Sequence, residues 1–167
     1  MADSALLKEL LHENERYADV FDRSKLAIQP AKHLAILACM DARLTVPDFL
    51  GLRTGDAHII RNAGGIATED AIRSLIISTR LLGTKEFVVI NHTDCGMLTF
   101  KDKDLQARLT KETGENASKV NFHSFSNLEE NVRTQVERIR TDRFLPRAVP
   151  VTGFVYDVRT GRLARVT

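Results

Sequence analysis

The sequence predicts a single α/β domain, residues 1–167, with a mostly parallel β-sheet flanked by helices. Two observations support this prediction. Short apolar runs typical of buried strands alternate with helical segments along the first hundred residues, and a length of 167 residues suits one compact domain. Hydrophobic residues make up 43% and charged residues 28% of the chain, close to globular averages, which argues against disorder and fibrous repeats.

The first element expected is an amphipathic helix over residues 4–21. Leucine and aromatic residues recur there at helical spacing, and Ser4 can act as the N-cap. The segment that follows Met1 lacks the basic and apolar regions of a secretory signal, so a cytoplasmic location is predicted. No strictly apolar run approaches the ~20 residues that a membrane span needs. With 24 basic and 22 acidic residues, the charge balance predicts neither nucleic-acid nor membrane-surface binding.

Three buried strands form the expected centre of the sheet. Each is a short, continuous apolar run, the pattern of a strand covered on both faces. They are predicted at residues 33–38, 57–61 and 86–90.

Helices are expected between and after these strands. Thr68 can cap a helix that continues over residues 71–82, with acidic residues near its positive end. Further helices are predicted at 47–50, 103–113 and 128–140, and two terminal strands at 153–157 and 162–166.

The two cysteines of the chain both fall near the carboxyl ends of predicted strands. Cys39 follows the first strand directly, and Cys95 follows the third strand, with His92 three residues before it. Ligands of open α/β sheets gather at the carboxyl ends of the strands. If the first and third strands are neighbours, two thiolates and one imidazole converge, and this donor set suits Zn²⁺.

Three other interpretations of these residues stay open. A cysteine can be a small buried hydrophobe, a disulfide is disfavoured in a reducing compartment, and a structural zinc would ordinarily have a fourth Cys or His ligand.

Asp41 and Arg43 lie close to Cys39 in the sequence. Asp41 could fill a fourth metal position or accept a hydrogen bond from a metal-bound hydroxide, whereas an ordinary loop ion pair is the alternative.

Three segments in order resemble the β-class carbonic anhydrases, most closely the short bacterial members. They are Cys39-x-Asp41-x-Arg43, the Arg-Asn-Ala-Gly-Gly segment at 61–65, and His-Thr-Asp-Cys-Gly-Met at 92–97. The resemblance covers a catalytic core of about residues 32–100, with a looser fit toward both termini.

The resemblance implies a zinc enzyme that converts CO₂ reversibly to bicarbonate and a proton by means of zinc-bound hydroxide. Cys39, His92 and Cys95 would bind zinc, and Asp41 and Arg43 would form a catalytic dyad. It also implies a homodimer, and an antiparallel strand at the C-terminal end of the sheet. The Gly64-Gly65 turn is expected to let the backbone approach the substrate pocket, with a plain strand-to-helix turn as the alternative.

The sequence departs from the plant-type pattern at two places. Gln29 directly precedes Pro30, so it does not take the spacing of the pocket glutamine, and no aromatic residue follows the Arg-Asn segment. Two other functions are compatible with the same predicted zinc site. One is hydrolysis of carbonyl sulfide or carbon disulfide at the same site, and the other is a non-enzymatic zinc-binding module.

Overall fold

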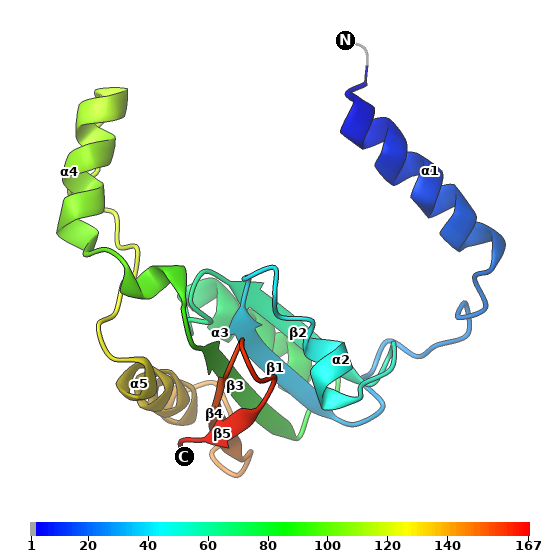
Figure 1. Cartoon of the computed structure of the whole chain (residues 1–167). Helices are drawn as coiled ribbons and strands as arrows, with labels where there is room; N and C mark the ends of the chain where they lie inside the picture. Colours follow the sequence, from blue (N-terminus) through cyan, green and yellow to red (C-terminus); the bar gives the residue numbers. More distant parts are fainter. Residues whose placement is uncertain (1–2) are drawn as a thin grey trace.

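The computed structural model describes residues 3–167 and contains a five-stranded sheet with the strand order β2-β1-β3-β4-β5 (Figure 1). Strands β1 (Leu34–Cys39), β2 (Ala57–Asn62), β3 (Glu86–His92) and β4 (Val151–Tyr156) pair in parallel. The short strand β5 (Leu163–Arg165) pairs antiparallel with β4. The predicted α/β fold with an antiparallel C-terminal strand is confirmed.

Two helices begin at the capping residues that the sequence predicts. Ser4 accepts a hydrogen bond from the backbone N–H of Leu7 at the start of α1 (Ala5–Asp19), 3.1 Å away. Thr68 does the same for Ala71 at the start of α3 (Glu69–Arg80). The remaining helical elements are α2 (Val46–Leu50), the 3₁₀ turn η1 (Gly96–Leu98), α4 (Asp102–Thr113) and α5 (Leu128–Thr141).

Strand β3 is longer than its apolar run predicts. The run ends at Ile90, but Asn91 and His92 continue the parallel ladder because they pair with Val155 and Tyr156 of β4. A polar residue can extend a strand when the neighbouring strand supplies its backbone partners. This extension places His92 inside the sheet rather than in the loop after it.

The two faces of the sheet are covered to different extents. On one face, α3 and α5 pack against β1 and β3, and residues such as Leu75, Val136, Leu37 and Val89 form a fully buried cluster. On the other face, α2 contributes Val46 to a smaller buried cluster, which is bordered by apolar side chains that remain half-buried. The second face therefore keeps apolar surface in contact with solvent.

Helix α1 lies apart from the sheet (Figure 1). None of its residues is buried, although its leucines form an apolar stripe, with Leu6 64% and Leu10 58% exposed. No helix within residues 3–167 is long and apolar enough to cross a membrane.

Close packing of α5 on β4 depends on a residue without a side chain. A Cβ atom on Gly153 would overlap the side chain of Val132 and lie 2.9 Å from Val136, both on α5. We predict that Gly153→Ala lowers the free energy of unfolding by about 1–3 kcal/mol through overpacking. Urea unfolding would measure the loss. Gly96→Ala is the matched control, because a Cβ there meets no atom within 4 Å. Equal stabilities of the two variants would contradict this account.

Candidate metal centre

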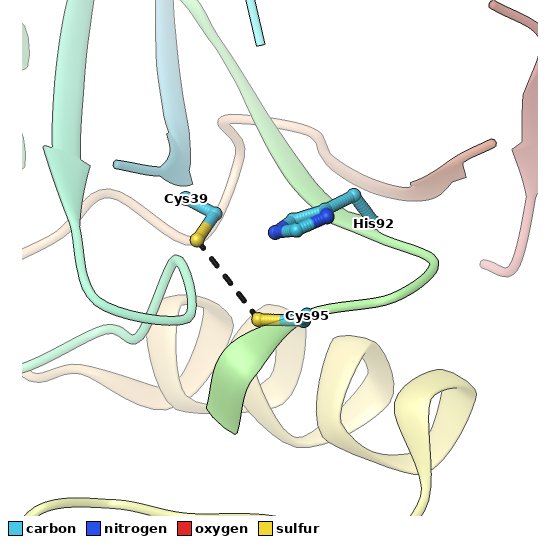
Figure 2. Close-up of side chains that lie close together, drawn as sticks. All are labelled: Cys39, His92 and Cys95. Carbon is cyan, nitrogen blue, oxygen red and sulfur yellow. Dashed lines mark hydrogen bonds between the residues drawn. The ribbon is translucent and has the colours of Figure 1, made fainter. Parts of the chain in front are cut away.

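The carboxyl edge of the sheet brings the predicted metal ligands together. Because β1 and β3 are adjacent and parallel, Cys39 at the end of β1 and His92 at the end of β3 lie at the same edge. The chain then turns, and Cys95 stands at the N-cap of η1. All three side chains point toward one another (Figure 2). The predicted convergence of these three residues is observed in the structure.

The three side chains form a compact, buried group. One ligand atom from each residue lies within 4.8 Å of the others, and the sulfur atoms of Cys39 and Cys95 are 4.0 Å apart. The exposed fractions are 4% for Cys39, 2% for Cys95 and 0% for His92. Buried donors this close together can share a single ion.

His92 has one ring nitrogen that is hydrogen-bonded and one that is not. Nδ1 lies 2.8 Å from the carbonyl oxygen of Thr93, and because a carbonyl only accepts, Nδ1 must carry the proton. In the neutral imidazole the lone pair then resides on Nε2, which is buried and has no hydrogen-bond partner among residues 3–167. A buried polar atom without a partner is costly, and metal ligation is a common explanation for one.

The donor set fits zinc. Two cysteine sulfurs and one histidine nitrogen are ligands that Zn²⁺ prefers, and three protein ligands leave a fourth position for water or substrate, as in catalytic zinc sites. The unpartnered Nε2 faces the two sulfurs (Figure 2). The arrangement of the three side chains thus agrees with the zinc site that the sequence predicts.

The two thiols have unequal acidity. A hydrogen bond with Cys95 lowers the pKa of Cys39 to about 4, despite an opposing contribution from burial. The same contact raises the pKa of Cys95 above its ordinary value, and burial adds to that effect. Burial opposes the charge of His92, but its contact with the Cys39 thiolate raises the pKa of His92 on balance. The pair of sulfurs therefore holds one negative charge readily, and a divalent cation would displace the remaining proton.

Asp41 and Arg43 form a two-pronged ion pair beside the cluster. The Asp41 carboxylate accepts hydrogen bonds from Nε and Nη2 of Arg43 at 2.9 and 2.8 Å, and from the Arg43 backbone N–H at 2.9 Å. These hydrogen bonds hold the pKa of Asp41 well below its usual range. Asp41 Oδ2 lies 3.8 Å from Nε2 of His92, so the carboxylate borders the ligand group while Arg43 holds it.

Three further hydrogen bonds, from two arginine side chains, fix the loops that carry these residues. The guanidinium of Arg61 on β2 donates to the carbonyl oxygens of Cys39 and Asp41, at 2.9 and 2.6 Å. Arg43 also donates from Nη2 to the carbonyl oxygen of Asp94, at 3.1 Å, in the loop before Cys95. Arg61 stands within the second motif, but nothing in the motif alone indicated that its side chain reaches across the end of β1.

The Gly64-Gly65 turn approaches the cluster through its backbone. Gly64 and Gly65 have φ angles of +81° and +61°, which residues with a side chain rarely adopt. The N–H of Gly64 donates to the sulfur of Cys39 at 3.3 Å. The close backbone approach expected from the sequence is therefore present, and its partner is Cys39, a predicted metal ligand. A role of the two glycines in lining a substrate pocket stays a prediction.

Comparison with known families decides where the chain belongs. The sequence model of the carbonic anhydrase family matches residues 34–163. The chain belongs to this family. The family assignment made from the three motifs is confirmed, and it favours the enzyme over the non-enzymatic zinc-binding module.

Individual relatives agree with the family assignment. β-Carbonic anhydrase 1 of Mycobacterium tuberculosis is 46% identical over 159 residues, which cover 95% of this chain and 96% of the relative. The crystal structure of the Streptococcus mutans carbonic anhydrase superposes with a TM-score of 0.94 at 40% identity, over the whole of both chains. A carbon disulfide hydrolase of Acidithiobacillus thiooxidans is 36% identical over 162 residues, covering 84% of this chain and 80% of that protein.

Proposed function

We propose that this protein hydrates CO₂ reversibly to bicarbonate and a proton, with zinc held by Cys39, His92 and Cys95. The observation that carries the proposal is the buried, unpartnered Nε2 of His92, which faces two sulfur atoms beside an arginine-held carboxylate. Zinc, when bound, would lower the pKa of a coordinated water and so supply hydroxide for attack on CO₂.

The Asp41–Arg43 pair gives this site a general acid/base group. Asp41 stays ionised because Arg43 donates to both of its carboxylate oxygens. Its Oδ2 borders the ligand group and can accept a hydrogen bond from a water there, which orients that water's lone pair toward a substrate carbon. Arg43 acts on the carboxylate and on the loop at Asp94, so it fixes the position from which Asp41 works.

Stopped-flow measurement of CO₂ hydration, combined with metal analysis, tests this function directly. One zinc per chain with rapid hydration supports the proposal. Zinc-replete protein with no hydration activity would contradict it and would favour the non-enzymatic module.

A second candidate substrate has a specific observation in its favour. Carbon disulfide is linear, like CO₂, and the carbon disulfide hydrolase that is 36% identical to this chain carries that activity in its name. Carbonyl sulfide shares the same shape. We favour CO₂ because the β-carbonic anhydrase is the more similar relative, at 46% identity. Turnover of the three substrates by one zinc-replete preparation would rank them.

The ligand assignment predicts the effect of removing each donor. Cys39→Ser, Cys95→Ser and His92→Ala should each lower zinc content sharply, because each variant removes one of the three protein ligands that hold the ion. Atomic absorption on purified protein measures the content. His33→Ala is a matched control, since His33 contacts the carbonyl of Gly83. Full zinc retention in all three variants would overturn the assignment.

The dyad predicts a loss of activity without a loss of metal. Asp41→Asn should keep its zinc, and its hydration rate should fall at least about tenfold. A general acid/base group contributes about 10²-fold or more to a rate, so a loss of this size is expected. Arg43→Ala should keep its zinc and lose most of its activity, because the carboxylate is then no longer held.

The control for the dyad is an Asp–Arg pair elsewhere on the surface. Asp70→Asn and Arg73→Ala break an exposed pair on α3, 2.9 Å apart, and should leave the rate unchanged. Near wild-type rates for zinc-replete Asp41→Asn from pH 6 to 9 would show that the Asp41–Arg43 pair is an ordinary loop ion pair.

We also propose that two copies of the chain associate, with α1 of each covering apolar surface on the other. Helix α1 has no buried residue in the single chain. The less covered face of the sheet has a cavity of about 370 Å³, lined partly by Leu34, Leu52 and Val88. An exposed apolar stripe of this kind commonly marks a protein contact.

A cytoplasmic location stays a prediction.

Association predicts that changes on the apolar side of α1 alter the mass in solution. Wild-type protein should scatter light as at least twice the 18.7 kDa of one chain. The double variant Leu7→Glu, Leu11→Glu should shift toward one chain, because both residues lie one helical turn apart on the apolar side. Glu9→Lys, which changes the opposite side, should not. A wild-type protein of 18.7 kDa at micromolar concentration would refute association.

A further inference from the structure

Three side-chain amides form a continuous chain in the core between α5 and β3. Asn91, Asn131 and Gln135 are 1%, 8% and 5% exposed. Asn91 precedes His92 on β3 and therefore projects to the opposite face of the sheet, toward α5. Asn131 and Gln135 lie one turn apart on α5, on the side that also carries buried valines. Polar groups this deeply buried are costly unless each one is satisfied.

The hydrogen bonds of the chain run in one direction. Asn91 Nδ2 donates to the carbonyl oxygen of Gly64 at 2.8 Å, and Asn131 Nδ2 donates to Asn91 Oδ1 at 2.7 Å. Gln135 Nε2 donates to Asn131 Oδ1 at 2.8 Å, and the backbone N–H of Ala67 donates to Gln135 Oε1 at 2.9 Å. Since one end is a backbone acceptor and the other a backbone donor, only this orientation of the three amides satisfies every group.

Both ends of the amide chain lie in the same turn. Gly64 and Ala67 belong to the segment between β2 and α3, so Asn91 of β3 holds that turn at one point and Gln135 of α5 holds it at another. The N–H of Gly64 is the group that donates to the sulfur of Cys39. A Cβ on Gly65 would lie 2.8 Å from Asn91 Nδ2 and 3.1 Å from the backbone of Ala38 and Cys39. The turn is thus fixed between the amide chain on one side and the ligand-bearing strand on the other.

We infer that Asn91, Asn131 and Gln135 are positioning residues for the metal centre, because they hold the Gly64 N–H against the Cys39 sulfur. This inference rests on the proposed zinc function. A hydrogen bond to a ligating sulfur fixes its position and stabilises its lone pairs, and loss of such a contact commonly costs 10- to 100-fold in metal affinity. The amide chain would therefore influence the metal from α5 and β3, although none of its hydrogen bonds goes to a ligand side chain.

The test uses Co²⁺ as a spectroscopic probe in the full-length protein, alongside Zn²⁺ affinity measured by chelator competition. Asn131→Leu removes the middle amide with a side chain of similar size. We expect its sulfur-to-Co²⁺ charge-transfer band to move to lower energy, and its zinc dissociation constant to rise about tenfold. Gln135→Met, which releases the Ala67 end, should shift both in the same direction.

Val136→Ala is the control, because it removes buried packing from the same helix without touching an amide. It should leave the band at its wild-type position. A wild-type band and zinc affinity in both amide variants would overturn the inference, as would an equal shift in Val136→Ala. Wild-type protein that binds Co²⁺ and Zn²⁺ but does not hydrate CO₂ would refute the proposed reaction, and the band shift would still decide the role of the amides.

Discussion

The parallel pairing of β1 with β3 is the constraint on which the rest of the site depends. The register that joins Leu34 to Glu86 and Ala38 to Ile90 brings the ends of both strands to one edge. A shift of one residue would turn every side chain of a strand to the other face. Leu37 packs into the cluster on one face and Ile36 into the cluster on the other, so such a shift would disrupt the packing of both faces. Core packing therefore sets the spacing of two ligands that are distant in the sequence.

The candidate metal centre has a buried part and a partly exposed part. Cys39, His92 and Cys95 are buried, where low polarity strengthens attraction between opposite charges, whereas the side chains of Asp41 and Arg43 are 20% and 49% exposed. A small molecule would therefore approach from the side of the ion pair. The ionised Asp41 carboxylate stands at this entrance, where it can accept a hydrogen bond from a water without opening the ligand cluster.

Sequence reasoning succeeded where the signal was local. Apolar runs predicted the strands, and Ser4 and Thr68 marked helix starts because capping involves only neighbouring residues. The convergence of Cys39 with the His92 loop also followed from one topological assumption. The amide chain could not be predicted in this way, since no residue type or spacing in the sequence marks Asn91, Asn131 and Gln135 as partners. The only hint was a pair of buried polar residues one turn apart on α5, and such spacing does not reveal a partner.

The guanidinium of Arg61 has a consequence for the end of β1. The ladder between β1 and β2 ends at the pair Cys39 and Asn62. Beyond it, the backbone N–H of Met40 donates a hydrogen bond to the carbonyl oxygen of Asn62. The Arg61 side chain donates to the carbonyl oxygens of both Cys39 and Asp41. The Arg61 side chain thus replaces the missing strand partner and keeps the end of β1 from fraying where the chain turns toward solvent. A lysine, with a single nitrogen at the end of its chain, could not span two carbonyls with the same planar fork.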